Sequence, residues 1–245
     1  MIRSAWRTAK SDPWLTPRHD MIRAMKIKVH AALLLGCAAL AAIPVETSAT
    51  LFENEQVKVL RALEKPHVKG KFHEHKLNRV MIYLQPGRQR FEYQDGRPSE
   101  VFDWKAGEVK WSPADGMHAP EVISQDAFNI IEVELKKPGT DQAVPGRLDP
   151  VKTDPKHYQL EFENAQVRVI RVTIEGHGTA PMHQHSLNRI TVFLTDQEFR
   201  IQEANGKVER MKHKAGDAVW GTPTTHTEEN LSDQPFEVVA IELKS

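Results

Sequence analysis

The sequence predicts an all-β protein built from two small β-barrels in tandem. Two observations predict this fold. The second half of the chain repeats the first, and each half is composed of short runs of β-branched and aromatic residues. No segment shows the sustained 3.6-residue apolar period, with caps, of an amphipathic helix. Hydrophobic residues make up 40% of the chain, enough for folded cores, so a disordered chain is excluded.

The repeat is visible in two ungapped blocks. Residues 52–61 (FENEQVKVLR) recur as 162–171 (FENAQVRVIR), and residues 73–79 (HEHKLNR) recur as 183–189 (HQHSLNR), each 110 residues later. A match of this kind indicates tandem duplication. We therefore expect one unit at 50–136 and a second at 160–245. The stretch between them, 137–159, is rich in Pro and Gly, which predicts a linker.

Strands and turns are predicted within each unit. The runs 57–60, 80–84, 190–194 and 236–241 have the composition of buried or half-buried strands. Asp95-Gly96 and Asn205-Gly206 lie between such runs and predict type I′ hairpins. Units of this size with these signals favour small barrels or sandwiches.

The N-terminal 49 residues are predicted to contain a targeting segment that is not part of the folded domains. From 25 to 49, two lysines precede an apolar run, 31–43, and small residues lead to a cleavage site after Ala49, as in a secretory signal peptide. The run is too short to span a bilayer, which takes about 20 residues. We expect a secreted or periplasmic protein that starts at Met25. A lipobox-like LLGC sequence leaves lipidation of Cys37 as the alternative.

The charge argues against nucleic-acid binding, and the cysteine content excludes an internal disulfide. The chain has 33 basic and 33 acidic residues, and removal of residues 1–49 takes away more basic than acidic ones. A mildly acidic protein is a poor partner for nucleic acid, whose phosphates select basic surfaces. A single Cys cannot form an internal disulfide. We therefore expect a small-molecule ligand or substrate, no nucleic acid and no transmembrane span.

Histidine spacing carries the candidate chemistry. In a strand, residues i and i+2 share a face, so an HxH strand presents two imidazoles to one metal ion, about 2.0–2.1 Å from each nitrogen. A third histidine from a later strand would complete the set and leave positions open for water, oxygen or substrate. The alternative is that these histidines alternate by chance, but both copies keep them while their neighbours change. The six predicted metal ligands are His73, His75 and His118, and His183, His185 and His226.

These residues resemble the motifs of the cupin superfamily, and the duplication resembles a bicupin. The first unit has HxH followed by Gly87 at the spacing of the first cupin motif, and the second unit has Gly216, Pro223, His226 and Asn230 of the second motif. The resemblance covers nearly all of 52–245. It implies a double-stranded β-helix, or jelly-roll, barrel for each unit, with the metal inside.

The departures from the cupin pattern are informative. The glutamate ligand is absent from both units, Gln197 stands where the first motif ends in Gly, and His67 and His177 replace its leading Gly. The remaining ligand set resembles the three-histidine variant of cupin sites, which implies an iron-dependent dioxygenase or related enzyme. The cofactor would be a divalent metal ion, Fe(II), Mn or Zn. Three neutral ligands favour a small anionic or chelating substrate.

The sequence leaves two further interpretations open. The chain could be a non-catalytic module that captures a small ligand, because the cupin fold alone does not specify a reaction. Cupin barrels also pair with one another. A homodimer is therefore an expectation, although the two repeats could satisfy each other.

Four other residues are candidates for catalysis. Arg79 and Arg189 could clamp a substrate carboxylate, since guanidinium binds carboxylate bidentately, or they could face outward and pair with an acid on the next strand. His67 and His177 could be general acid or base groups at the barrel mouth, or could form loop hydrogen bonds.

Two matched pairs complete the candidates. Glu121 and Glu229 lie three residues after the third histidine, so they could orient an imidazole or be exposed acids. Asn78 and Asn188 follow the HxH segments, and we expect them to form hydrogen bonds at turns or at the barrel mouth.

Overall fold

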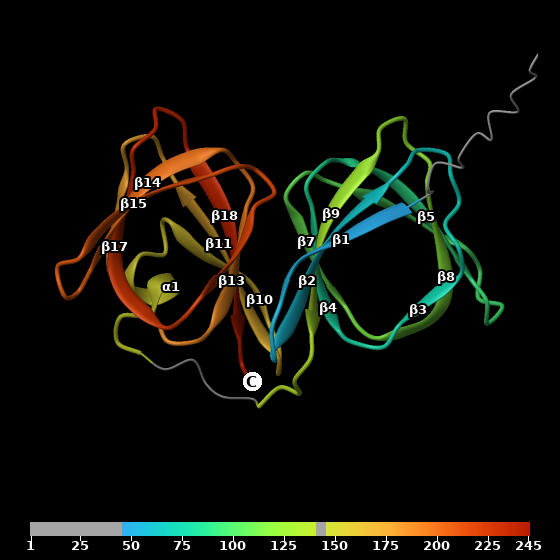
Figure 1. The fold of residues 1–245 in the computed structure, drawn as a ribbon, viewed down its shortest axis with the longest axis horizontal. Helices are drawn as coiled ribbons and strands as arrows, with labels where there is room; N and C mark the ends of the chain where they lie inside the picture. Colours follow the sequence, from blue (N-terminus) through green and yellow to red (C-terminus); the bar gives the residue numbers. More distant parts are fainter. Residues whose placement is uncertain (1–45, 141–145) are drawn as a thin grey trace, which may run out of the picture. The chain divides into compact units, whose positions relative to one another are not determined.

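The computed structural model describes residues 46–140 and 146–245, which form two β-barrels (Figure 1). The first barrel consists of β1 (Glu46–Glu53), β2 (Val57–Glu64), β3 (His73–His75), β4 (Arg79–Tyr83), β5 (Gly87–Tyr93), β6 (Glu100–Trp104), β7 (Glu108–Ser112), β8 (Asp115–Val122) and β9 (Phe128–Leu135). The second contains α1 (Pro150–Thr153), β10 (Tyr158–Glu163), β11 (Val167–Ile174), β12 (Thr179–His185), β13 (Arg189–Phe193), β14 (Gln197–Glu203), β15 (Val208–His213), β16 (Ala218–Gly221), β17 (Thr224–Asn230) and β18 (Phe236–Leu243). The prediction of two tandem all-β barrels is confirmed.

Each barrel has a five-stranded and a four-stranded antiparallel sheet with the same strand order. The five-stranded sheets run β1-β2-β9-β4-β7 and β10-β11-β18-β13-β16, and the four-stranded sheets run β3-β8-β5-β6 and β12-β17-β14-β15. An irregularity is also shared, because the register shift between Thr50 and Phe52 recurs between Leu160 and Phe162. Two antiparallel sheets whose neighbouring strands are distant in sequence form the expected jelly-roll.

Strand β4 shows how the sequence places side chains on the two faces of the five-stranded sheet. All five of its residues are buried. Arg79, Met81 and Tyr83 face the barrel interior and line its cavity, whereas Val80 and Ile82 belong to a hydrophobic cluster on the other face. Because strand side chains alternate between faces, Arg79 at the start of this otherwise apolar strand points inward.

The two barrels share that outer hydrophobic cluster. It contains Val80 and Ile82 of the first barrel together with Val169, Ile190 and Ile241 of the second. The outer faces of the two five-stranded sheets therefore pack against each other, as in a sandwich of two sheets. This packing explains why central strands such as β4 are buried on both faces.

Reciprocal hydrogen bonds cross between the barrels. Asn78 Nδ2 donates to Gln166 Oε1, and Asn188 Nδ2 donates to Gln56 Oε1 at 2.8 Å. The two bonds are related by the 110-residue offset of the duplication. The same surface of each barrel therefore contacts its counterpart on the other barrel, as in a two-fold symmetric dimer. Within one chain the repeats thus form the pairing expected of two separate barrels. A homodimer of the whole chain stays a prediction.

The hairpin turns differ from the type I′ turns that the sequence predicted. Gly96 and Gly206 have φ of 85° and 87°, but the residues before them do not have positive φ. In the second barrel the amide of Gly206 donates to the carbonyl of Glu203 at 2.8 Å, which gives a longer loop ending in a left-handed glycine. Asp95 and Asn205 accept the amide two residues on, at 3.1 and 2.8 Å, so their side chains stabilise a right-handed turn residue.

The stretch 137–159, predicted to be a linker, contains ordered elements of the second barrel. Helix α1 begins after Asp149, whose side chain accepts the amide of Lys152 at 3.2 Å, and Figure 1 shows the helix beside the second barrel. Strand β10 begins at Tyr158, which is 1% exposed in the barrel core. The C-terminal part of this stretch therefore belongs to the second barrel.

Most of the predicted signal peptide, residues 25–45 with Cys37, lies outside the described residues. Strand β1 begins at Glu46 and pairs with β2 from there, so cleavage after Ala49 would fall inside this strand. Among the described residues, no helix has the length and apolarity needed to cross a bilayer.

Candidate metal centres

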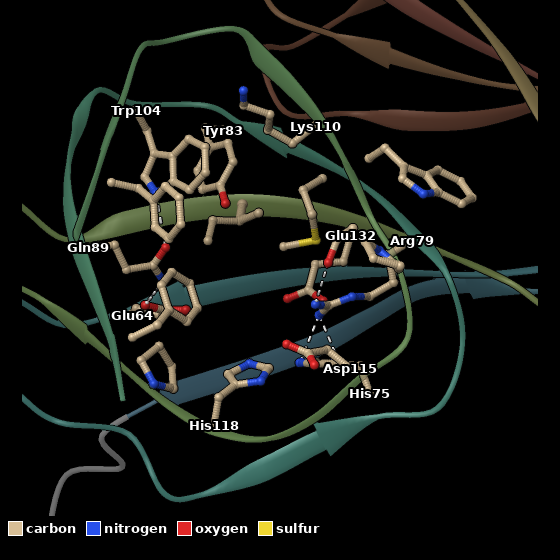
Figure 2. A pocket seen from close by; sticks show the side chains of 18 of the residues that line it. Glu64, His75, Arg79, Tyr83, Gln89, Trp104, Lys110, Asp115, His118 and Glu132 are labelled. Atoms are coloured by element: carbon tan, nitrogen blue, oxygen red, sulfur yellow. Dashed lines mark hydrogen bonds and ion pairs between the residues drawn. The ribbon is translucent and has the colours of Figure 1, made fainter. Parts of the chain in front are cut away.

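The first histidine triad lies on two neighbouring strands. His73 and His75 are the ends of β3, and His118 lies on β8 directly opposite His73. One nitrogen from each of the three rings lies within 4.8 Å of the others. Figure 2 shows His75 and His118 at one end of the cavity, below Arg79. The i, i+2 argument from the sequence is confirmed in its geometry, because both β3 histidines turn to the same side.

The second triad repeats this arrangement at greater depth. His183 and His185 end strand β12, and His183 pairs with His226 of β17. Their ligand atoms also lie within 4.8 Å of one another. The three residues are 0%, 4% and 3% exposed, so this triad is shielded from solvent more completely than the first, in which only His118 is buried.

Hydrogen bonds orient the imidazole rings. In three histidines Nδ1 donates to the carbonyl two residues earlier: His73 to Lys71 at 2.9 Å, His118 to Gly116 at 3.1 Å and His183 to Pro181 at 2.8 Å. A ring protonated at Nδ1 presents the lone pair of Nε2, which is the form that binds a metal. Nε2 of His183 is buried without a partner among the described residues. The donor set and this unpaired nitrogen fit a divalent metal ion.

Burial favours the neutral state that ligation requires in five of the six histidines. Burial, followed by the nearby Arg79, lowers the pKa of His75 to about 3. Burial and its histidine neighbours lower the pKa of His226 to about 2. Burial also lowers the pKa of His118, His183 and His185. Neutral imidazoles at pH 7 need not lose a proton before they bind a cation.

The first triad opens into a cavity of about 360 Å³ inside the first barrel (Figure 2). Arg79 projects into it, and its Nη1 donates to Glu132 Oε2 at 2.8 Å while Nη2 donates to Ser112 Oγ at 2.9 Å. The same Nη1 lies 2.8 Å from the ring nitrogens of His75. Arg79 therefore faces inward, contrary to the outward-facing alternative, but it does pair with an acid on the neighbouring strand β9, as that alternative expected. Its charge is already balanced by a buried carboxylate.

The second triad opens into a cavity of about 430 Å³ inside the second barrel. Arg189 lines this cavity, and its Nη1 donates to the carbonyl of Thr222 at 2.8 Å. Within the described part of the chain no carboxylate forms an ion pair with Arg189. Burial lowers the pKa of its guanidinium. On the cavity wall Tyr158 donates its hydroxyl to Glu228 at 3.1 Å, and burial raises the pKa of Glu228 to about 7.

His67 and His177 do not join either triad, which corrects the predicted catalytic role. Neither residue lines a cavity, and both have left-handed backbones with φ of 56° and 58°. The amide of His67 donates to Val122 O at 2.7 Å, and the side chain of His177 is bonded to Asp233 at 2.7 Å on the surface. They hold turns at positions where positive φ favours glycine, which explains the cupin glycine that they replace.

Glu121 and Glu229 do not touch the histidines either. Glu121 forms an ion pair with Arg90 at 3.1 Å, and Glu229 pairs with Arg200, each across two neighbouring strands of the four-stranded sheet. They lie three residues after a ligand on a strand, so they point to the opposite face. Of the two alternatives that the sequence left open, orientation of an imidazole is therefore wrong.

Three acids and an aromatic residue that face the triads were not predicted from the sequence. They are Glu132, Glu228, Glu242 and Tyr158. Glu132 and Glu242 each interrupt a strongly apolar β-run, at 130–133 and 238–243. A carboxylate inside such a run is a signal for a buried partner, because an unpaired buried charge is costly.

Comparison with solved structures supports the architecture. AerE from Microcystis aeruginosa matches with a TM-score of 0.60 and 15% identity over 82% of this chain and 98% of that chain. The oxalate decarboxylase of Bacillus subtilis, which has Mn(II) centres, matches with a TM-score of 0.57 and 15% identity over 80% of this chain and 72% of that chain. No family model and no curated protein matches the sequence. Likeness at this identity establishes the fold.

The fold and the paired sites together define the class. Two jelly-roll barrels in tandem, each with an HxH strand and a third histidine facing its interior, give this chain the fold of a bicupin. Each barrel presents three imidazoles that can hold one divalent metal ion.

Proposed function

We propose that this bicupin is a metal-dependent enzyme that acts on a small anionic or chelating substrate in an Fe(II)-type dioxygenase reaction. One observation carries the proposal. In the second barrel Arg189 lines the same cavity as His185 and His226, and no carboxylate among the described residues forms an ion pair with it. A buried guanidinium without an ion-pair partner beside a three-histidine site is suited to an anion that also contacts the metal.

The residues of the second cavity have distinct tasks in this proposal. His183, His185 and His226 hold the ion, which would supply Lewis acidity and, as Fe(II), redox chemistry with dioxygen. Arg189 would bind and orient a substrate carboxylate or enolate oxygen with its planar fork of N–H donors. Apolar residues such as Phe193 and Phe199 line the wall and exclude water from the space between them.

Metal analysis is the first test. We expect elemental mass spectrometry to find about two ions per chain, with His73→Ala/His75→Ala and His183→Ala/His185→Ala each losing one. The protein loaded with Fe(II) should then consume oxygen with a member of a panel of carboxylic acids, phenols and diketones. Failure to bind any metal, or to consume oxygen with the whole panel, would overturn the enzyme proposal. Ligand-induced shifts in melting temperature without turnover would instead indicate a binding module.

We also propose export, on the basis of the residues before the first barrel. The lysines, apolar run and small residues of 25–49 support a signal peptide. Expression of the full chain in a bacterial host should give a periplasmic protein whose N-terminal residue is Thr50. A cytoplasmic protein that retains Met25, or a lipid on Cys37, would contradict this expectation.

A further inference from the structure

A chain of buried ionic contacts leads from the segment before β10 to the second triad. Arg168 holds Asp149 through two bonds, Nη1 to Oδ2 at 2.7 Å and Nη2 to Oδ1 at 3.0 Å. The same Arg168 Nη1 donates to Glu242 Oε2 at 3.1 Å, and the other carboxylate oxygen of Glu242 accepts Nδ1 of His185 at 2.8 Å. All four residues are at most 5% exposed. Asp149 is thus connected to a metal ligand through two intermediates.

This chain fixes His185 more firmly than a single hydrogen bond would. A carboxylate that accepts from Nδ1 selects the tautomer with a free Nε2 and makes that nitrogen a better donor to a metal. Glu242 can turn little, because Arg168 binds its second oxygen, and Arg168 is itself held by the bidentate contact with Asp149. The backbone of the same segment also reaches the HxH strand, since Leu148 O accepts the amide of Gln184 at 2.7 Å.

Among the described residues, none of these contacts recurs in the first barrel. The position equivalent to Arg168 is Lys58, and the one equivalent to Glu242 is Glu134. Within the described part of the chain, neither residue contacts His75. The sequence position 110 residues before Asp149 is Ala39.

The ring of His75 has a different neighbour in the first barrel. It faces the guanidinium of Arg79, with Nη1 2.8 Å from its nitrogens. An N–H donor on that ring competes for the lone pair that a metal would use, whereas the acceptor beside His185 directs its lone pair toward the metal.

We propose that Asp149, Arg168 and Glu242 are positioning residues for the second triad and make it the tighter of the two metal sites. The segment 146–158, which is part of the second barrel (Figure 1), supplies Asp149 to this site. The inference rests on the proposed metal binding, but it does not depend on the reaction or the substrate.

Co(II) binding to variants that keep only one of the two triads tests this inference. The His73→Ala/His75→Ala protein leaves only the second triad, and the His183→Ala/His185→Ala protein leaves only the first. Calorimetry should give a Kd for Co(II) at least tenfold lower for the second triad. In that background Arg168→Lys, which installs the residue of the first repeat, and Asp149→Asn should each weaken Co(II) binding about 10- to 100-fold. The visible absorption bands of bound Co(II) should shift as the ring of His185 reorients.

Matched variants separate positioning from loss of fold. Lys58→Arg and Glu134→Gln, in the protein that keeps the first triad, should leave its Kd for Co(II) unchanged. Glu242→Gln retains an acceptor for His185 and should bind Co(II) more tightly than Glu242→Leu. Circular dichroism of each metal-free variant checks that the barrels are intact.

Two outcomes would overturn the inference while leaving the proposed function in place. One is equal affinity of the two triads for Co(II). The other is a Kd for the second triad that Arg168→Lys and Asp149→Asn do not change. If neither triad bound Co(II), the proposed metal-dependent function and this inference would fail together, and the wild-type protein would already show it.

Discussion

Arg79 and Glu132 form an ion pair inside the first barrel, and the second barrel has no counterpart because Ala240 occupies the place of Glu132. The paired atoms are 2.8 Å apart, and the two side chains are only 7% and 10% exposed. Arg189, the counterpart of Arg79, is bonded to a backbone carbonyl instead. The equivalent arginines therefore differ, because Arg79 has an ion-pair partner and, among the described residues, Arg189 has none.

Removal of Glu132 should destabilise the metal-free protein strongly. Glu132→Ala leaves Arg79 as a buried charge without a counter-ion, which costs about 3–5 kcal/mol in the free energy of unfolding. Urea denaturation followed by far-UV circular dichroism measures the loss. The double variant Glu132→Ala/Arg79→Met removes both charges and should recover most of it. If the double variant were less stable than Glu132→Ala, the ion pair would not be the cause.

Arg189 should determine anion affinity in the second cavity. Loss of a hydrogen bond to a charged group costs about 1.5–3 kcal/mol, so Arg189→Met should weaken the binding of a small carboxylate about 10- to 100-fold. Calorimetric titration of oxalate and acetate into the metal-loaded protein provides the measurement. Arg79→Met is the matched variant, and it should change carboxylate affinity less than tenfold because Glu132 already neutralises Arg79. Equal effects of the two substitutions would show that the cavities do not differ in this way.

Most of the fold could be predicted because it depends on local patterns that occur twice. The repeats, the β-runs and the HxH spacing each follow from strand periodicity, and the structure confirms two jelly-roll barrels with matching strand order. The turn type could not be predicted from Asp-Gly and Asn-Gly alone. The side chains of Asp95 and Asn205 bind nearby amides and stabilise a different turn.

The site could be predicted only where the position of a residue follows from its spacing in the sequence. His73 and His75 meet His118 because adjacent strands bring them together. Asp149 reaches the second triad through Arg168, and nothing in a Pro-rich stretch indicates such a tertiary contact. His177 illustrates the opposite case, because the sequence leaves both a catalytic role and a loop hydrogen bond open. The structure shows a surface hydrogen bond to Asp233 and a left-handed backbone that explains the position.

The metal-free protein should lose stability in acid because buried histidines resist protonation. Burial lowers the pKa of His226 to about 2, whereas a histidine in an unfolded chain has a pKa of about 6.5. Between these values the unfolded state binds a proton that the folded state does not. The stability contributed by this group is therefore complete above about pH 6.5 and is lost as the pH falls, with a slope of up to about 1.4 kcal/mol per pH unit.

Urea denaturation in the presence of a chelator, repeated from pH 8 to pH 4, measures this dependence. His226→Asn keeps a polar side chain of similar size but cannot titrate, so its free energy of unfolding should fall less steeply with acid than that of the wild type. Identical profiles for the two proteins would show that His226 is not protonated on unfolding in this range.

The reciprocal asparagines should differ in their effect on stability, although they occupy equivalent positions. Asn188→Ala removes the bond to Gln56 across the barrel interface, at a cost of about 1 kcal/mol. Asn78→Ala removes the equivalent bond to Gln166 and also the acceptor for the amide of Ala114, 2.9 Å from Asn78 Oδ1, so we expect about 2 kcal/mol. Urea denaturation of both variants at pH 7 gives the comparison. Because the barrels share one hydrophobic cluster, each variant should unfold in a single transition. Equal losses would mean that the Ala114 contact adds nothing, and two separate transitions would mean that the barrels fold independently.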